Sequence, residues 1–450
     1  MAERSEASFT EGDLSRHVIR LSGFMILGFL AMTLAQFVEA VYLGIVGTEA
    51  LAAVTFTFPA VMALGAMTRG LTLGGGVRVA RAVGVGDRER AAVLTTHGLL
   101  LVLIFTVGCA SLLAGFARPL FHLLGARGEV LELVVAYARV WSIGFPLFGL
   151  SMAGTLYMRS IGDPVFPGYV LTLGSVLQVA IGPFLIFGWT GLPALGVEGA
   201  AWGFVVARSL AFLLTVYWFA VRERMLRRSL KGLVASTRVI LHVGIPAMAT
   251  NVIEPLATAV ITRLLAGLGT AVVAGFGVAA RIEAVVFMVV IGISSSTAPL
   301  VGQNWGARRF DRVSRALAIC YRYCLAWGAI AACVMWIGGF TFVSLINDEP
   351  GVVATATTYL YIIPLTIGFI GMTNVANGAF NAMSKPLPAL CLSVLRLFVF
   401  YVPLALLGSR YFGYTGVFVA MACTNVIVGL WARTWNARTI ARERRRLAPA

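Results

Sequence analysis

Three carboxylic acids lie inside long apolar stretches of this 450-residue chain, where an acid is costly and therefore chemically informative. They are Glu39, Glu254 and Glu283, out of 19 acidic residues in total. A charged side chain in hydrocarbon costs at least about 2.5 kcal/mol, so each carboxylate needs a partner, a bound proton or cation, or a water-filled cavity. We therefore predict that Glu39, Glu254 and Glu283 are cation-coupling residues of a membrane protein.

Glu254 has the most suggestive surroundings of the three. It lies near the middle of its apolar stretch, eight residues after Pro246 and directly before Pro255. A proline leaves a carbonyl of the preceding turn without its helical hydrogen bond, and that oxygen can bind a cation. The alternative interpretation of Pro255 is a simple helix kink. As the most central of the three acids, Glu254 is the strongest candidate to bind a proton or a cation.

The other two acids have different neighbours. Gln36 and Glu39 are three residues apart and share a helix face, so we expect Gln36 to line a cavity with Glu39. Glu283 is two residues from Arg281, which is the wrong spacing for a pair on one face, so we favour a pair with another helix over a ligand role. Five further arginines in or near the apolar stretches are interpreted as structural, because they can pair or extend to the membrane surface: Arg69, Arg139, Arg208, Arg263 and Arg396.

The composition identifies the elements that must position these residues. The chain is 59% hydrophobic and 12% charged, whereas soluble domains carry about 25% charged residues. Apolar runs of the length that crosses a bilayer recur along the chain, and the short alternating segments of an outer-membrane barrel are not evident. We predict an all-α membrane protein with twelve transmembrane helices at residues 18–43, 50–76, 92–115, 130–157, 166–189, 197–221, 239–266, 271–300, 315–340, 352–380, 387–408 and 413–436.

Basic residues predict the orientation of these spans. The net charge is +16, and Lys and Arg cluster in alternate loops, whereas the remaining loops hold only Arg118, Arg127 and Arg410. Basic loops stay on the cytoplasmic side, so we expect both termini to be cytoplasmic. We interpret the basic tail, residues 437–450, as an anchor to lipid headgroups and not as a nucleic-acid site.

The second half of the sequence repeats the first. A shift of 222 residues places Gly47 on Gly269, Gly84 on Gly306 and Pro164 on Pro386; near the end the shift becomes 217, which places Gly196 on Gly413. Six spans per half is an even number, so the halves should have parallel topology around an axis along the membrane normal. We predict bundles at 1–221 and 239–436, joined by a basic linker at 222–238, with a cavity between them that suits alternating access.

Several short motifs occupy the loops between the predicted spans. In the first half they are Val46-Gly47-Thr48-Glu49-Ala50-Leu51-Ala52-Ala53, Gly84-Val85-Gly86-Asp87, Arg159-Ser160-Ile161-Gly162-Asp163-Pro164 and Leu195-Gly196-Val197-Glu198-Gly199-Ala200-Ala201. In the second half they are Gly244-Ile245-Pro246 and Val301-Gly302-Gln303-Asn304-Trp305-Gly306-Ala307. In this order and spacing, over almost the whole chain, they resemble the multidrug and toxic compound extrusion (MATE) transporters.

The resemblance implies a fold and an activity. It implies two six-helix bundles in a bacterial inner membrane and cation-coupled export of amphipathic, often cationic compounds, with H⁺ or Na⁺ as the coupling ion. We expect small organic molecules and membrane lipids as partners, a monomer, and no nucleic acid. Glu254, eight residues after Pro246, resembles the acidic cation site in the second half of the bacterial members, so we expect it to be the main coupling carboxylate. A cation and a solute that compete for its one charge would give antiport. The predicted substrate cavity includes Gln36, Gln178, Asn251, Asn374 and Asn377.

The sequence departs from the family pattern at the polar positions. Glu39 stands where the family usually has Asp, which keeps the charge but moves the carboxylate. Where related members have Asn and Asp four residues apart before a proline in span 5, this chain has Gln178 and Gly182 before Pro183. A proton relay between spans 1 and 5 is therefore in question. Span 10 lacks the acid of some bacterial members and carries Asn374, Asn377 and Asn381, as neutral ligands or as hydrogen bonds between helices.

Other functions compete with a drug exporter. A flippase for lipid-linked saccharides of the same superfamily would line its cavity with basic residues for pyrophosphate; the intramembrane acids and loop motifs favour the exporter. A channel or a membrane enzyme would need a selectivity filter or a catalytic cluster, and neither is evident. The six cysteines and four histidines show no disulfide or metal-site pattern, so we expect no metal, no organic cofactor and no enzyme activity.

Overall fold

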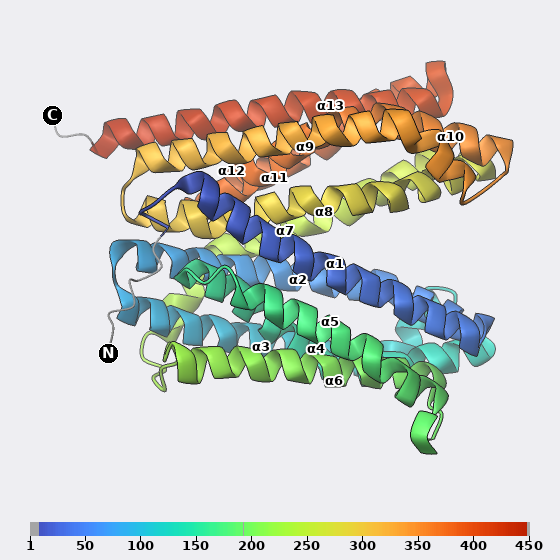
Figure 1. Ribbon diagram of the computed structural model, residues 1–450, viewed down its shortest axis with the longest axis horizontal. Coiled ribbons are helices and arrows are strands. Elements are labelled where there is room, and N and C mark those ends of the chain that lie inside the picture. The colour runs from blue at the N-terminus through green and yellow to red at the C-terminus, as the bar shows by residue number, and fades with distance from the viewer. Residues whose placement is uncertain (1–8, 192, 448–450) are drawn as a thin grey trace. The chain divides into compact units, whose positions relative to one another are not determined.

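A computed structural model of the chain describes residues 9–191 and 193–447, with the side chains of residues 48, 190 and 254 outside that description. The described residues form helices and short connections without a strand (Figure 1). They divide into two compact units. Unit 1 contains residues 27–248, and unit 2 contains residues 9–26 together with residues 249–447.

Unit 1 holds most of α1 (Leu14–Val46) and the five helices that follow it. These are α2 (Thr48–Val85), α3 (Arg88–Leu123), α4 (Gly128–Ile161), α5 (Phe166–Phe187) and α6 (Gly196–Tyr217), with the short turns η1 (Trp189–Gly191) and η2 (Trp218–Arg222). Helix α4 packs against α2, α3 and α6 and is the most buried of these spans. Each helix is as apolar as a membrane crossing requires.

Unit 2 repeats this order with more interruptions. It contains α7 (Leu233–Ala266) from residue 249 onward, then α8 (Thr270–Gly306), α9 (Phe310–Ser344), α10 (Pro350–Ile362), η3 (Pro364–Thr366), α11 (Ile367–Ala382), α12 (Pro386–Val394), η4 (Leu395–Tyr401) and α13 (Val402–Leu447). The counterpart of α4 is broken at Pro364, because proline cannot donate the helical hydrogen bond. Its two parts, α10 and α11, form the most buried span of unit 2.

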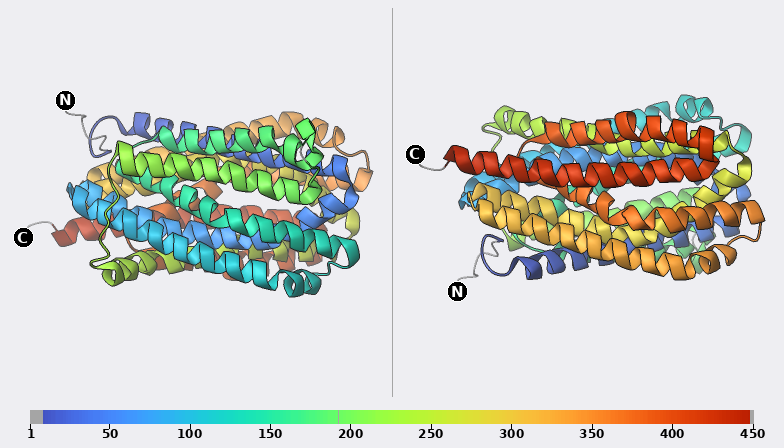
Figure 2. Two further views of the ribbon diagram at one scale, coloured as in Figure 1. Left: turned by 90° about the horizontal axis from the view of Figure 1, so that it is seen from below. Right: turned by 90° about the horizontal axis from the view of Figure 1, so that it is seen from above.

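The last helix contains two crossings of opposite direction. Gly413 lies inside α13 with φ 59° and ψ −141°, which is not a helical conformation. A Cβ added to Gly408 would overlap the Gly416 carbonyl, so the backbones at these two positions touch. Eight residues of continuous helix would separate them by about 12 Å, and the chain therefore reverses at Gly413. The two segments lie side by side in Figure 2 (right).

This reversal reconciles the structure with the twelve predicted spans. Eleven described helices are long and apolar enough to cross a membrane, and the last of them runs from Pro386 to Arg446 through Gly413. The all-helical fold with twelve crossings is confirmed. The sequence predicted a break between residues 408 and 413, and Gly413 supplies it because glycine tolerates positive φ.

The loop motifs of the sequence have a local structural explanation. In the motif after α2, Gly86 adopts φ 84° and ends the helix, and the Asp87 carboxylate caps α3 by accepting from the Arg90 N–H at 2.8 Å. In the motif after α4, Gly162 adopts φ 118°, and Asp163 accepts from the N–H groups of Val165 and Phe166 at 2.9 and 3.0 Å. These motifs therefore fix the turns between helices.

Candidate functional site

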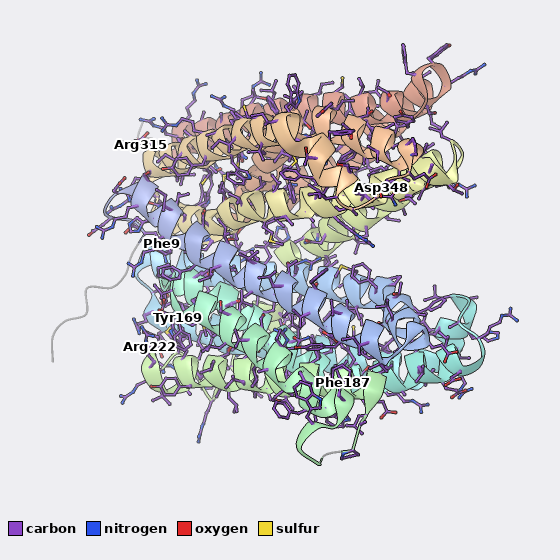
Figure 3. The ribbon with its side chains drawn as sticks, turned by 45° about the vertical axis from the view of Figure 1, so that its right-hand side comes forward. Phe9, Tyr169, Phe187, Arg222, Arg315 and Asp348 are labelled. Atoms are coloured by element: carbon purple, nitrogen blue, oxygen red, sulfur yellow. The ribbon has the colours of Figure 1, made fainter. Side chains whose placement is uncertain are left out.

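A chain of three polar side chains crosses the middle of unit 1. Gln178 lies about halfway along α5, whose two ends are marked by Tyr169 and Phe187 in Figure 3. Its amide nitrogen donates to the Glu39 carboxylate of α1 at 2.6 Å, and its amide oxygen accepts from the Arg208 guanidinium of α6 at 3.0 Å. One amide thus joins a carboxylate to a guanidinium, donating to the first and accepting from the second.

Arg208 is held in an apolar and aromatic environment. Its residue is 4% exposed, and its guanidinium carbon lies 5.2 Å from the ring centroid of Phe204 and 5.6 Å from that of Phe148. Its Nε finds no hydrogen-bond acceptor among the described residues. The positive charge is therefore balanced by Glu39 through the amide of Gln178 and by the faces of two aromatic rings.

A small cavity adjoins the carboxylate. It is lined by Ala35, Glu39, Tyr42, Gln178, Val179, Gly182, Ile186, Ala200 and Gly203. Because Pro183 has no N–H, the carbonyl of Val179 one turn earlier loses its helical donor, and the Tyr42 hydroxyl lies 3.4 Å from that oxygen. The cavity thus presents a carboxylate, an amide and a phenol hydroxyl in an otherwise apolar wall.

Tyr42 also explains the glycine at position 182. A Cβ added to Gly182 would lie 2.9 Å from Cε2 and 3.0 Å from Cδ2 of the Tyr42 ring. The space that an aspartate would need at this position is filled by that aromatic ring. The departure from the family pattern in span 5 is therefore paired with a bulky residue on span 1.

Unit 2 carries a second carboxylate and a second guanidinium. The Tyr359 hydroxyl of α10 donates to the Glu283 carboxylate of α8 at 2.5 Å, and Tyr359 is 1% exposed between the rings of Phe276 and Phe418. The predicted pairing of Glu283 with another helix agrees with this contact.

The guanidinium of unit 2 belongs to Arg396, which lies in the π-helical segment η4. It donates to the Asn425 side-chain oxygen at 3.0 Å, and the Asn425 amide nitrogen donates to the Thr366 hydroxyl at 3.1 Å. Thr366 ends η3, the turn that interrupts the central span. These contacts join three crossings of unit 2 at the place where its central helix is broken.

The remaining predicted site residues are dispersed. Glu254 lies within α7, but its side chain is outside the described residues. Gln36 is exposed, and Asn251, Asn374 and Asn377 are half-buried in unit 2. The side-chain oxygen of Asn377 has no hydrogen-bond partner among the described residues. Among the predicted residues, the structure brings together Glu39 and Gln178.

Two residues of these networks were assigned a purely structural role from the sequence. They are Arg208 and Arg396, which hold the amides of Gln178 and Asn425. A signal was present: an arginine at membrane depth requires compensation, and Glu39 was the acid of the same half that lacked a partner. The sequence did not show that an amide on a third helix would join them.

In the described part of the chain, the side chains that could bind a metal ion do not come together. No group of three or more His, Cys, Asp or Glu side chains there could hold a metal ion. The six cysteines are free.

Comparisons with known proteins agree with this architecture. The family model described as MatE matches residues 25–184 and again residues 246–407, so each half of the chain matches it once. The chain is 31% identical to the FAD transporter of Shewanella oneidensis over 420 residues, and this aligned region covers 93% of each chain. It is 23% identical to the probable multidrug resistance protein YoeA of Bacillus subtilis over 413 residues, and this aligned region covers 88% of each chain.

A solved structure shows the same fold. The crystal structure of the Vibrio cholerae MATE transporter VcmN in its bent form superposes with a TM-score of 0.90 at 26% identity. The match covers 96% of this chain and 97% of the other. The likeness therefore extends over both halves.

Proposed function

The chain belongs to the MatE family of membrane transporters, and from that premise we propose that it exports amphipathic organic compounds by cation-coupled antiport. It is a multi-pass bacterial membrane protein and a transporter, not an enzyme. One observation carries the proposal: the Glu39 carboxylate lines a cavity between apolar helices of unit 1 and is held by the amide of Gln178. A carboxylate in that position is open to a cation on one side and fixed on the other.

The geometry supports competition at Glu39. With its charge intact, the carboxylate accepts from Gln178 and balances Arg208. A proton, a Na⁺ ion or a cationic solute that reaches Glu39 from the cavity neutralises the same charge, so occupancy by one disfavours the others. Such exclusion is the requirement for antiport. We propose that Glu254, near the middle of α7, provides the corresponding charge in the second half.

Glutamine variants test this proposal. Glu39→Gln and Glu254→Gln keep the approximate shape and hydrogen-bonding capacity but remove the ionisable charge. In vesicles with proton and sodium gradients imposed separately, we expect at least a tenfold loss of gradient-driven efflux of a cationic dye in each variant at matched protein level. Wild-type efflux in both variants would contradict the proposal, and the gradient that drives the wild type identifies the coupling ion.

A second candidate function is the export of flavin nucleotides. The specific observation is the FAD transporter of Shewanella oneidensis, 31% identical and matched over 93% of each chain. FAD combines a pyrophosphate with aromatic rings, and guanidinium groups bind phosphate oxygens well. Arg208 offers a buried guanidinium between two aromatic rings, with its Nε unpartnered among the described residues. The same feature would suit the pyrophosphate of a lipid-linked saccharide, the flippase alternative.

Flavin release distinguishes these candidates. Cells that express the chain should release FAD into the medium at least tenfold faster than cells with an empty vector, whereas lipid-linked saccharide turnover should not change. Arg208→Lys should reduce FAD release more than dye efflux, because lysine cannot bind phosphate in a bidentate manner. Dye efflux without FAD release would exclude the flavin candidate and leave the multidrug one.

The placement of the chain in the membrane is a further part of the proposal. The distribution of basic residues favours cytoplasmic termini, with the halves 1–221 and 239–436 as bundles joined by the linker at 222–238. Reporter fusions at Ala450 and near Gly125 should report the cytoplasmic and the outer side respectively. An external C-terminus would contradict the twelve-span orientation.

A further inference from the structure

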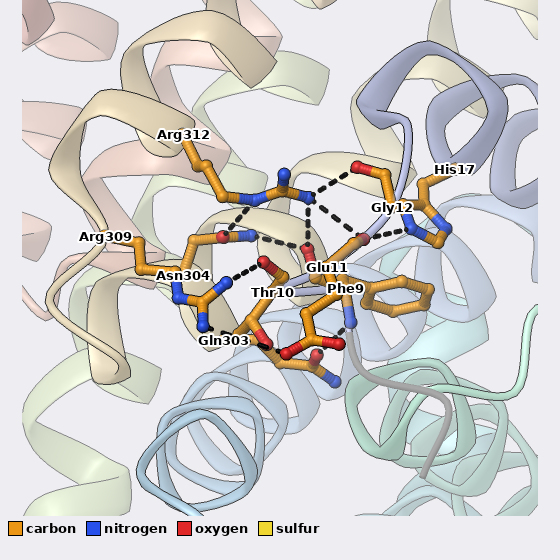
Figure 4. A network of polar contacts seen from close by, with 9 residues as sticks. All are labelled: Phe9, Thr10, Glu11, Gly12, His17, Gln303, Asn304, Arg309 and Arg312. Carbon is orange, nitrogen blue, oxygen red and sulfur yellow. Dashed lines mark hydrogen bonds and ion pairs between the residues drawn. The ribbon is translucent and has the colours of Figure 1, made fainter. Parts of the chain in front are cut away.

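Residues 9–12, which lie just before α1, are bound by their main chain to α8 and α9 of unit 2 (Figure 4). The Phe9 N–H donates to the Gln303 side-chain oxygen at 2.8 Å, and the Phe9 carbonyl accepts from the Asn304 amide at 3.1 Å. The Arg309 guanidinium donates to the Thr10 carbonyl at 2.5 Å. We name residues 9–12 the N-terminal strap; its contacts lie at the end of α8 and the start of α9.

Arg312 holds the strap most extensively. Its Nη2 lies 3.2, 3.0 and 3.0 Å from the carbonyl oxygens of Phe9, Glu11 and Gly12, and its Nε donates to the Asn304 side-chain oxygen at 3.2 Å. Gly12 adopts φ 72°, which turns the chain so that three carbonyls converge on one guanidinium. The basic residues around position 310 are expected from the sequence to fix the membrane orientation; in the structure Arg309 and Arg312 also bind residues 9–12 of the chain.

Phe9 and Thr10 of the strap are buried, and so are the amide partners of Phe9, whereas Glu11 and Gly12 are exposed. Phe9 is 3% exposed, and Gln303 and Asn304 are both 0% exposed. The Phe9 ring meets the His17 ring edge-on at a centroid distance of 5.3 Å. If the strap dissociated, the buried side chains of Gln303 and Asn304 and the carbonyls of Phe9 and Thr10 would lose these hydrogen bonds together, which makes repeated opening costly.

The residues just before α7 and in its first turn show a similar arrangement in unit 1. His97, 0% exposed on α3, has its two ring nitrogens 2.9 Å from the Ser236 hydroxyl and 3.0 Å from the Ser229 carbonyl. The Arg227 N–H donates to the Thr96 hydroxyl at 2.9 Å. Each half of the sequence thus enters its first helix from a segment that is fixed to a compact unit.

The first turns of α1 and of α7 pack against the same units as the segments that precede them. In unit 2, a Cβ added to Gly292 of α8 would overlap Ile26 of α1; in unit 1, a Cβ added to Gly70 of α2 would overlap Met248 of α7. The 222-residue shift relates these two contacts residue by residue. The division between the units falls directly after Ile26 and directly after Met248. The start of α1 therefore belongs to unit 2, and the part that carries Glu39 belongs to unit 1.

We propose that the N-terminal strap is a built-in ligand of the α8–α9 end of unit 2 that stays bound throughout the transport cycle and fixes the start of α1. The binding site consists of Gln303, Asn304, Arg309 and Arg312, whose side chains form hydrogen bonds with the main chain of the strap. Only the consequence for transport rests on the proposed function; the bound state can be measured without a substrate.

Hydrogen exchange tests the bound state in the purified full-length protein. The Phe9 amide should exchange at least tenfold faster in Arg312→Gln than in the wild type. Arg308→Gln is the matched control, because it removes the same charge four residues earlier in the chain and Arg308 is exposed. Equal Phe9 exchange in the wild type and Arg312→Gln would show that Arg312 does not hold the strap and would overturn the assignment.

Cross-linking tests whether the strap stays bound during transport. The Glu11 carboxylate lies 3.9 Å from the Arg309 guanidinium, so Glu11→Cys with Arg309→Cys can be bridged by a bifunctional methanethiosulfonate after Cys109, Cys333, Cys391 and Cys423 are replaced by serine. We expect dye efflux within twofold of the same protein after reduction. Arg312→Gln should lower efflux at least threefold relative to Arg308→Gln. Efflux that stops on cross-linking and returns on reduction would show that the strap opens in each cycle, and would overturn the proposal.

Discussion

The two units place similar chemical groups on different helices. In unit 1 the carboxylate is on the first helix of the half, the amide Gln178 on the fifth and the guanidinium Arg208 on the sixth. In unit 2 the guanidinium Arg396 is on the fifth crossing and the amide Asn425 on the sixth. The 217-residue shift of the last spans places Arg208 on Asn425, so the arginine and the amide have exchanged helices.

The exchange shows that the helix packing repeats between the two halves more closely than the positions of the polar side chains do. Glycine contacts, turns and helix order repeat between the halves, because they are set by close packing and backbone geometry. Polar groups can move to a neighbouring helix and still reach a partner, provided that every buried charge remains compensated. We therefore expect the two units to respond differently to the loss of equivalent groups.

The largest difference is expected for the two arginines. Arg208→Met leaves Glu39 and Gln178 without their buried positive partner and should cost about 3–5 kcal/mol of stability. Arg396 is half-buried, so Arg396→Met should cost clearly less. The measurement is thermal unfolding in detergent together with the yield of folded protein.

A double variant separates charge imbalance from lost packing. Glu39→Gln combined with Arg208→Met removes both charges, so most of the lost stability should return. If the double variant is as unstable as Arg208→Met, then Arg208 acts through packing on Phe148 and Phe204 and not through charge.

A smaller effect is expected from restoring the acid that span 5 lacks. Gly182→Asp must displace the Tyr42 ring and should destabilise the protein by about 1–3 kcal/mol, as overpacking does. Gly203→Ala is the matched control, because Gly203 lines the same cavity and has no atom within 4 Å of an added Cβ. Tyr42→Ala should rescue Gly182→Asp. A stable Gly182→Asp with intact Tyr42 would show that the ring moves aside at little cost.

The two tyrosine hydroxyls differ in the charge of their acceptors. Tyr359→Phe removes a 2.5 Å bond to the Glu283 carboxylate and should cost about 1.5–3 kcal/mol. Tyr42→Phe removes a 3.4 Å contact with the Val179 carbonyl and should cost less than about 1 kcal/mol. Unfolding in denaturant ranks the two. The reverse ranking would mean that Glu283 is held mainly by its other contacts.

Much of the fold could be predicted because it depends on local properties of the sequence. Apolar runs defined the crossings, and Gly413 separated the last two as expected. The loop motifs that suggested the family are the residues that cap and end helices, such as Gly86 and Asp87. Such features need no knowledge of which helices touch.

The candidate site was only partly predictable because it depends on contacts between distant helices. Glu39 and Gln178 were identified by their types, but they lie 139 residues apart, and their link through Arg208 follows from the packing of three helices. The meaning of Gly182 depends on Tyr42, a residue that no motif singled out. The N-terminal strap binds a motif nearly 300 residues away, and no periodicity predicts such a contact.

The smallest effect is expected at Gln36, the residue for which helix periodicity and the structure point in different directions. Its spacing from Glu39 predicts a cavity residue, but its side chain is exposed, and the cavity beside Glu39 is lined instead by Ala35 one position earlier. A substitution on an exposed face away from buried contacts changes stability by less than about 0.5 kcal/mol. Gln36→Ala should therefore leave unfolding and dye efflux close to wild type, whereas Gln178→Ala, which breaks the link between Glu39 and Arg208, should lower both. A threefold loss of efflux in Gln36→Ala at unchanged stability would show that Gln36 meets the substrate after all, and that the helix-face prediction was the better guide to the transport path.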